Sequence, residues 1–309
     1  MTIVVPVKNR PRLVVRALDS IKAQTWRPLR VVVVDNGSTD ETPEVLRNWK
    51  RKSESEDFVV DIVEELVPGP AAARARGVEE VDSRLMMHFD SDDEMGPRHV
   101  EAIMDRFAEI DGPDLVFFRF RRHFQNGSKM VSHAPGGGGI MVSHLVHSTL
   151  STLNYACETA LIRRAGSWNR DLTCWEDYEL GTRLLLESRR RAYLKEVNVD
   201  VYSRQNSVTG RDFTSKAGEW EKALDSIGNT FEKTARPQRK KWLRYVAYRR
   251  AILAAHYRRE GNQEEAEKLL LKALEDENLN SLQRSFLRLA YRYTALGGRG
   301  AAKAARFIL

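Results

Sequence analysis

The chain has 309 residues, of which 42% are hydrophobic, and its formal net charge is +7. This length predicts one large domain or two ordinary ones, with enough apolar residues for a full core. No apolar stretch approaches the roughly 20 residues that a membrane helix requires, and the N-terminus shows no signal-peptide pattern. Two cysteines exclude a disulfide scaffold and fit a reducing compartment. We therefore expect a cytoplasmic protein.

The first half of the chain alternates strand-like and helix-like patterns. The run at 31–34 consists of four consecutive valines, as expected for a strand that is buried on both faces of a parallel sheet. Repeated alternation of strand and helix predicts a mostly parallel sheet with helices on both faces. Strands are expected at 3–7, 31–34, 58–66, 85–89 and 114–121, and helices at 11–23, 71–81 and 99–110.

Polar residues follow three of these strands where each one ends. Asn9, Asp35 and Asp90 occupy these positions. In open α/β sheets, ligands bind beyond the carboxyl ends of the strands. The convergence of three polar strand ends therefore predicts a ligand site at that edge of the sheet.

The acidic cluster Asp90, Asp92 and Asp93 is the most informative motif. Three close carboxylates repel one another unless a cation offsets their charge. Mg²⁺ and similar hard cations bind through one or two carboxylates together with substrate phosphates. A solvated acidic turn is the plain alternative. An EF-hand calcium loop is disfavoured, because Met95 stands where that loop needs glycine.

From residue 213 onward the pattern is almost wholly helical, which predicts two domains, 1–212 and 213–309. The segment 251–278 resembles a tetratricopeptide-like pair of helices around Gly261 and Asn262, and a single such unit is expected to pack on the preceding domain or on a partner. From residue 210 onward, 21 Lys and Arg stand against 12 Asp and Glu, a balance of +9. We expect this tail to dock on the inner membrane face through amphipathic helices such as 240–255. Interleaved acids and the lack of a motif disfavour a nucleic-acid partner.

Four motifs together resemble the family 2 glycosyltransferases, over about residues 2–210. They are Thr2-Ile-Val-Val-Pro-Val-Lys-Asn9, Val31-Val-Val-Val-Asp35-Asn-Gly-Ser-Thr-Asp40, Phe89-Asp-Ser-Asp-Asp93 and Trp175-Glu-Asp-Tyr-Glu-Leu180. The resemblance implies a GT-A fold, to which the helical pattern from residue 213 onward adds a helical C-terminal extension. It also implies an inverting, metal-dependent transfer of a sugar from a nucleotide-sugar, with a UDP-sugar expected. The acceptor would be a saccharide or a lipid-linked glycan of surface polysaccharide synthesis.

The resemblance also implies roles for particular residues. Pro6 and Asn9 would line the nucleoside pocket, and Asp35 would accept a hydrogen bond from the base. A plain Asx-turn is the alternative for Asp35. Asp90 would contact the ribose, and Asp92, assisted by Asp93, would hold Mn²⁺ or Mg²⁺ against the diphosphate.

Three further roles follow from the same resemblance. Arg74 and Arg204 would contact the diphosphate, although a surface arginine is the alternative for Arg74, and the family's Asn after that Arg is replaced by Ala75. Asp177 would be the catalytic base that takes the acceptor's proton. Taken without the resemblance, Glu176 and Asp177 favour an acidic helix start that the helix dipole stabilises. A non-catalytic sugar-nucleotide binder or a basic scaffold protein remains the alternative function.

Overall fold

The computed structural model describes residues 1–109, 111–134, 139–203 and 213–309. The described residues form two compact units. The first, the sheet unit, is drawn from Met1–Ala134, Leu150–Thr173 and Leu186–Asn206. The second, the helical unit, is drawn from Pro135–Thr149, Cys174–Leu185 and Ser207–Leu309. The helical unit thus gathers two segments from the middle of the chain, whereas the predicted boundary at 212/213 divides the chain only once.

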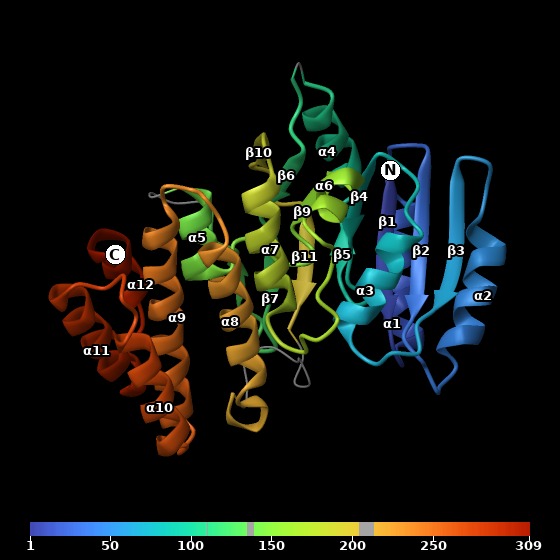
Figure 1. Ribbon diagram of the computed structural model, residues 1–309. Coiled ribbons are helices and arrows are strands. Elements are labelled where there is room, and N and C mark those ends of the chain that lie inside the picture. The colour runs from blue at the N-terminus through green and yellow to red at the C-terminus, as the bar shows by residue number, and fades with distance from the viewer. Residues whose placement is uncertain (110, 135–138, 204–212) are drawn as a thin grey trace. The chain divides into compact units, whose positions relative to one another are not determined.

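The sheet unit is built on a seven-stranded sheet in the order β10-β6-β9-β4-β1-β2-β3 (Figure 1). β1 pairs parallel with β2 and β4, and β2 pairs parallel with β3, while β9 runs antiparallel to β4 and β6. The sheet is therefore mostly parallel, as the sequence predicts. Its strands are β1 (Thr2–Val7), β2 (Leu29–Asp35), β3 (Phe58–Glu64), β4 (Leu85–His88), β6 (Leu115–Phe118), β9 (Tyr155–Glu158) and β10 (Arg191–Leu194).

A second, four-stranded sheet belongs to the same unit and has the order β5-β11-β7-β8. β11 pairs antiparallel with β5 and parallel with β7. Because β5 follows directly on the acidic cluster, this small sheet fixes the backbone next to the candidate site. Its strands are β5 (Glu94–Met95), β7 (Arg121–His123), β8 (Lys129–Val131) and β11 (Val199–Tyr202).

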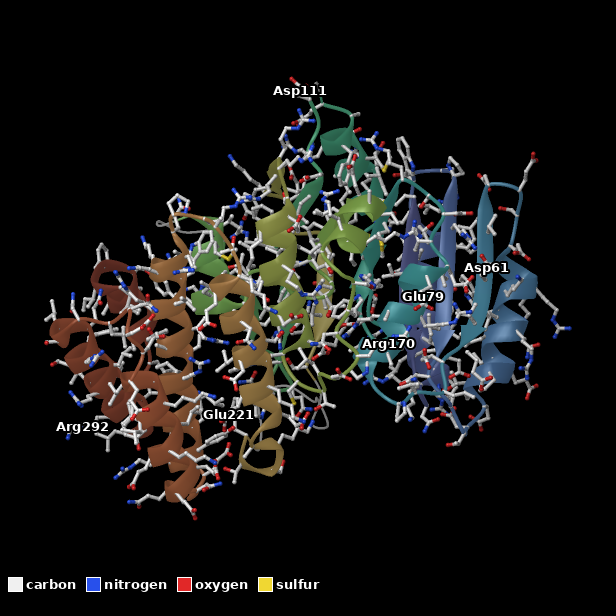
Figure 2. The ribbon with its side chains drawn as sticks, viewed as in Figure 1. Asp61, Glu79, Asp111, Arg170, Glu221 and Arg292 are labelled. Carbon is white, nitrogen blue, oxygen red and sulfur yellow. The ribbon has the colours of Figure 1, made fainter. Side chains whose placement is uncertain are left out.

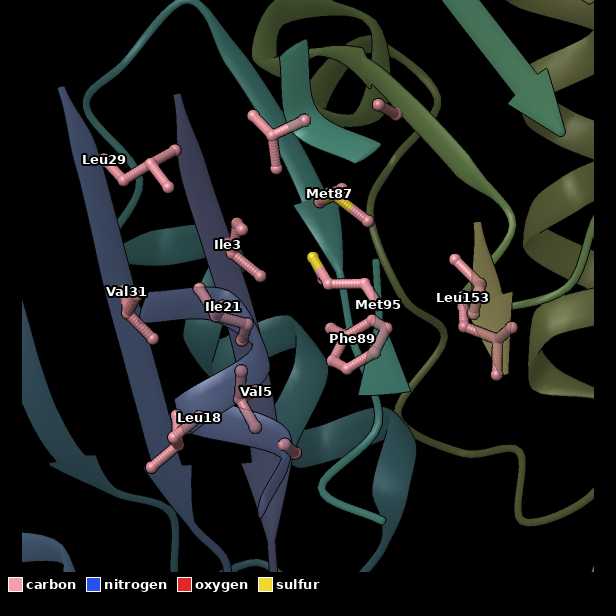
Figure 3. Packing of buried hydrophobic residues seen from close by; sticks show 14 of the residues in the cluster. Ile3, Val5, Leu18, Ile21, Leu29, Val31, Met87, Phe89, Met95 and Leu153 are labelled. Atoms are coloured by element: carbon pink, nitrogen blue, oxygen red, sulfur yellow. The ribbon is translucent and has the colours of Figure 1, made fainter. Parts of the chain in front are cut away.

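Helices cover both faces of the large sheet because the side chains of its central strands alternate. Ile3 and Val5 of β1 pack with Leu18 and Ile21 of α1 in the core shown in Figure 3. The helices of the sheet unit are α1 (Pro11–Lys22), α2 (Thr42–Ser53), α3 (Pro70–Glu79), α4 (His99–Phe107) and α6 (Thr159–Arg164).

The other face of the sheet is covered by α3, which approaches β1 and β2 very closely. A Cβ added to Gly77 would lie 2.2 Å from Val4 Cγ1 and 3.2 Å from Val34 Cγ2. Only glycine fits at this contact, and its absence of a side chain sets the helix directly on the sheet. The N-terminus of α3 consequently lies next to the strand ends that carry the candidate site.

The helical unit is organised around the long helix α9, which packs against α5, α8, α10 and α11. Most of α7 also belongs to this unit, where Tyr178 Oη donates to the carbonyl of Leu145 at 2.9 Å. α9 and α10 confirm the predicted pair of helices around Gly261. The helices are α5 (Ile140–His147), α7 (Glu176–Glu187), α8 (Glu219–Glu232), α9 (Arg239–Arg259), α10 (Gln263–Leu274), α11 (Ser281–Ala295) and α12 (Ala301–Ile308), with a 3₁₀ turn at Thr214–Lys216.

α9 differs from the expectation that 240–255 forms an exposed amphipathic helix. Tyr245, Val246, Ala247 and Tyr248 are consecutive buried residues, so the helix is buried on several sides. Three of its arginines form hydrogen bonds within the unit. Arg244 donates to the carbonyl of Asn278, and Arg249 and Arg250 also donate to groups of the same unit. The prediction of a membrane-facing helix at 240–255 is therefore wrong, because tertiary packing surrounds this segment.

Candidate active site

The expected nucleoside end of the site lies where β1 and β2 end side by side in parallel register, with Val7 opposite Asp35. Asn9, in a left-handed backbone conformation, ties the two strand ends together. Its Oδ1 accepts the N–H of Thr39 at 2.8 Å, and its N–H donates to Ser38 Oγ at 2.9 Å. The amide of Asn9 thus orders the loop after β2. Pro6 is the penultimate residue of β1 and is half-buried.

Asp35 is the last residue of β2 and is 7% exposed. Its Oδ1 accepts the N–H of Ser38, three residues on, at 3.0 Å. An Asx-turn uses the N–H two residues on, so this bond differs from the turn that the sequence leaves as an alternative. The bond and a base contact are compatible, since a carboxylate has two acceptor oxygens.

The acidic cluster follows β4, the strand on the other side of β1. Its carboxylates have different environments. The side chains of Asp90 and Asp92 are 26% and 17% exposed, whereas Asp93 is buried and accepts the backbone N–H of Tyr202 at 3.1 Å. Burial, together with the charges of Asp90 and Asp92, raises the pKa of the Asp93 carboxyl well above its ordinary range. Asp93 therefore fastens the cluster to β11, while Asp90 and Asp92 reach solvent.

Arginine side chains offset the charge of the cluster. Arg10, at the start of α1, forms an ion pair with Asp92. Arg16, two turns further along α1, donates from Nη2 to the backbone carbonyl of Asp92 at 2.6 Å and pairs with Glu94 at 2.9 Å. Arg16 also lies over the ring of Tyr202, with 4.3 Å from its Cζ to the ring centroid. α1 thus supplies cations that the sequence pattern did not reveal.

Arg74 of α3 holds Asp90. Its Nη2 lies 3.1 Å from Asp90 Oδ1, and its side chain is 9% exposed. The guanidinium packs over the ring of Trp168, with 5.0 Å from Cζ to the ring centroid. Trp168 Nε1 donates in turn to His88 Nε2 at 3.1 Å. Burial and the nearby Arg74 lower the pKa of His88 to about 3, so its ring is a neutral acceptor. This buried chain fixes the orientation of Arg74 and hence of Asp90.

Carboxylate oxygens are the right ligand chemistry for Mg²⁺ or Mn²⁺. No group of three or more His, Cys, Asp and Glu side chains within the described ranges is arranged to hold a metal ion. Asp92 fits as one exposed protein ligand of a cation that takes its remaining oxygens from substrate phosphates and water. Asp93, fastened to β11, fits that role less well.

Asp177 lies in the first turn of α7 and belongs to the helical unit. Its Oδ1 accepts the N–H of Tyr178 at 2.7 Å. Trp175, two residues before Asp177, has a positive φ of 53°, so the backbone turns sharply just before the helix begins. The ring of Trp175 is 4.7 Å from Arg249 Cζ. Arg204 lies outside the described residues, and its predicted diphosphate contact stays a prediction.

A family model described as glycosyl transferase family 2 matches residues 2–168. The chain belongs to glycosyl transferase family 2. The matched range contains β1, β2, β4 and the acidic cluster, so the three motifs that carry the resemblance in the first half of the chain lie inside it.

The chain matches only part of the length of its curated relatives. A stretch of 116 residues is 32% identical to the glycosyltransferase GlyA of Streptococcus pneumoniae, over 38% of this chain and 16% of that protein. Another of 120 residues is 24% identical to a GalNAc(5)-diNAcBac-PP-undecaprenol beta-1,3-glucosyltransferase of Campylobacter jejuni, over 38% of each protein. The chain thus spans well under half the length of these relatives.

Solved structures share the fold over nearly the whole chain. TarS 1-349 of Staphylococcus aureus matches with a TM-score of 0.71 at 16% identity, over 99% of this chain and 90% of that one. The mannosyltransferase PcManGT of Pyrobaculum calidifontis, in complex with GDP-Man and Mn²⁺, matches with a TM-score of 0.59 at 18% identity, over 99% and 83%. These likenesses confirm the predicted GT-A fold class with its helical extension.

The family 2 motifs identified the carboxylates but not the side chains that hold them. No sequence motif links Arg10, Arg16, His88, Trp168 or Tyr202 to the acidic cluster. Arg10 directly follows Asn9 of the first motif, which was the one available hint. The other partners come from α1, β4 and β11, and no spacing rule links them to the acidic cluster.

Proposed function

We propose that this chain is an inverting, metal-dependent glycosyltransferase that transfers a sugar from a UDP-sugar to a hydroxyl of a saccharide or lipid-linked acceptor. The observation that carries the proposal is the position of Asp35, Asp90 and Asp92 at the carboxyl ends of β2 and β4, the parallel strands on either side of β1. Membership of family 2 supports the reaction class. Structures of TarS with UDP and with UDP-GlcNAc share the fold, which supports a uridine donor.

The donor's parts match the partners that the sheet unit offers. Asp35 and Asn9 border the place for the base, and Asp90, oriented by Arg74, is placed for the ribose. A divalent cation held by Asp92 would neutralise the diphosphate when bound and assist its departure. Arg10 would then leave Asp92 and pair with the anionic diphosphate. Its charge would thus offset Asp92 before the donor binds and the diphosphate afterwards.

Asp177 takes the role of general base in this proposal. Its carboxylate accepts the proton of the acceptor hydroxyl while the acceptor oxygen bonds to the anomeric carbon and the nucleoside diphosphate leaves. A single displacement inverts the anomeric configuration. Relatives named for teichoic acid and undecaprenol-linked glycan synthesis support a cell-surface polysaccharide as the product class.

The deciding experiment is donor hydrolysis with purified protein and UDP-, GDP-, CMP- and dTDP-sugars, with and without Mn²⁺. Asp92→Ala is the test variant, and Asp105→Ala, at an exposed position of α4, is the matched control. We expect Mn²⁺-dependent release of UDP that Asp92→Ala lowers at least 100-fold and that the control leaves unchanged.

Nucleotide binding by calorimetry complements the hydrolysis assay, because a missing acceptor can slow turnover. Binding of UDP without hydrolysis, together with an unaltered affinity in Asp92→Ala, would support a non-catalytic binder. The absence of both binding and hydrolysis for every nucleotide would reject the enzyme and favour a scaffold function.

A further inference from the structure

The end of the helical unit combines positive charge with exposed apolar side chains. Residues 278–309 contain no Asp or Glu and six basic residues, namely Arg284, Arg288, Arg292, Arg299, Lys303 and Arg306. α9 is also basic and has no acid, but its neighbours in sequence carry acids, such as Glu264 and Glu265 at the start of α10. Residues 278–309 therefore carry +6 of the tail's balance of +9.

α11 is apolar on two sides. Its inner side buries Phe286, Leu287, Ala290 and Tyr291 within the helical unit. Its outer side exposes another row, in which Leu282 is 70%, Leu289 65%, Tyr293 47% and Leu296 89% exposed. The spacings of seven, four and three residues place this row on one face. A row of exposed apolar side chains on one helix face is typical of an interaction site, and nothing in the described part of the chain covers this row.

Basic side chains border this row. Arg288 and Arg292 are exposed one turn apart on the side of α11 next to Leu289 and Leu296, and Arg292 projects outward in Figure 2. The flexible aliphatic stems of arginines let them lie along apolar surface while their charges stay in a polar layer. The arrangement places cations at the edge of an apolar strip.

α12 lies beside the start of α11. Gln283, at the start of α11, donates from Nε2 to the carbonyl of Ile308, the last residue of α12, at 3.0 Å. There Phe307 is 90% exposed and Lys303, one turn earlier on the same face, is exposed as well. We name Leu282, Leu289, Tyr293, Leu296 and Phe307, with Arg288, Arg292 and Lys303, the α11–α12 face.

We propose that the α11–α12 face docks the protein on an anionic lipid surface. The apolar side chains would enter the boundary between headgroups and acyl chains, and the cations would pair with lipid phosphates. This inference goes beyond the proposed transfer reaction and does not depend on it.

Charge decides between possible occupants. A second copy of this face would set its three cations against three of the same sign, which opposes self-association. A nucleic acid offers anions but no apolar layer for Leu282, Leu289 and Leu296. An anionic bilayer satisfies the cations and the apolar row together. α9, the helix expected from the sequence to face the membrane, is packed inside the unit, and the α11–α12 face takes its place.

The test is sedimentation of the 309-residue chain with vesicles of phosphatidylcholine alone and of phosphatidylcholine with phosphatidylglycerol. Two double variants separate the two contributions. Arg288→Gln with Arg292→Gln should weaken binding to anionic vesicles about 25-fold, since each cation near such a surface contributes about fivefold. Leu289→Gln with Leu296→Gln should weaken it about 100-fold, since each buried leucine contributes about tenfold or more.

Leu271→Gln is the matched control, because Leu271 is a 58% exposed leucine on α10, outside the face. It should bind like the unaltered protein. Equal binding to both vesicle types, no binding to either, or equal effects of control and test variants would overturn the proposal. So would a dimer that Leu289→Gln with Leu296→Gln dissociates while vesicles go unbound, since that result assigns the face to a second copy.

Discussion

Arginines are used in opposite ways at the strand ends of the sheet unit and on the α11–α12 face. At the strand ends, Arg10, Arg16 and Arg74 each contact the acidic cluster. On the α11–α12 face, the cations stand in a stretch without any acidic residue. Arginine paired within the fold positions its carboxylate, whereas arginine without local acids is available to an external anion. The neighbours of an arginine therefore indicate its function better than the number of arginines in the region does.

The largest expected effect tests whether the helical unit takes part in the chemistry. Asp177→Asn keeps the side-chain size and the oxygen that accepts the N–H of Tyr178, but removes the basic group. We expect kcat of glycosyl transfer to fall 10²- to 10⁴-fold, the usual contribution of a general base. UDP affinity should not change.

The neighbouring acid offers the control for this variant. Glu176→Gln removes a negative charge from the same helix start, so the two variants alter the helix dipole interaction alike. A similar loss of kcat in both would show that helix stability, and not proton transfer, explains the effect of Asp177→Asn.

The next effect concerns pH. Burial lowers the pKa of His99, in the core of the sheet unit, to about 3, and neither of its ring nitrogens has a hydrogen-bond partner among the described residues. Below pH 6.5 the unfolded chain binds a proton at this residue that the folded chain does not bind until about pH 3. The free energy of unfolding therefore falls by about 2 kcal/mol on this account between pH 7 and pH 5.

His99→Leu should remove that share of the acid destabilisation. Urea unfolding at pH 7 and at pH 5 measures it, because the loss between the two pH values should be about 2 kcal/mol smaller in the variant. An identical loss in both proteins would show that His99 is protonated in the folded state at pH 5.

The smallest expected effects contrast the two kinds of arginine directly. Arg74→Ala leaves Asp90 without its guanidinium partner and removes packing on Trp168. Because the Asp90 side chain is 26% exposed, we expect a loss of about 1–3 kcal/mol in unfolding free energy, less than for a fully buried pair. Arg288→Gln should change it by no more than about 0.5 kcal/mol. Urea unfolding of both variants measures the contrast, which equal losses would contradict.

The sequence by itself predicted the alternation of strands and helices, because periodicity and turn residues act over short distances. It also placed Asn9, Asp35 and Asp90 at strand ends, since parallel strands bring their carboxyl ends to one edge. The helix pair around Gly261 followed from the same local patterns. The fold class and the family were predictable for these reasons.

Only the tertiary structure decided how the acidic cluster is held and which tail helix is exposed. Arg16 and Asp92 are 76 residues apart in sequence, and their contact depends on how α1 packs on the sheet. Asp92 and Asp93 are adjacent in sequence, yet only Asp93 is buried, because β11 covers it. The composition of α9 suggested an exposed basic helix, but α5, α8, α10 and α11 surround it. Packing partners that are distant in sequence determine which side chains are buried and which are paired, and local sequence patterns do not reveal these partners.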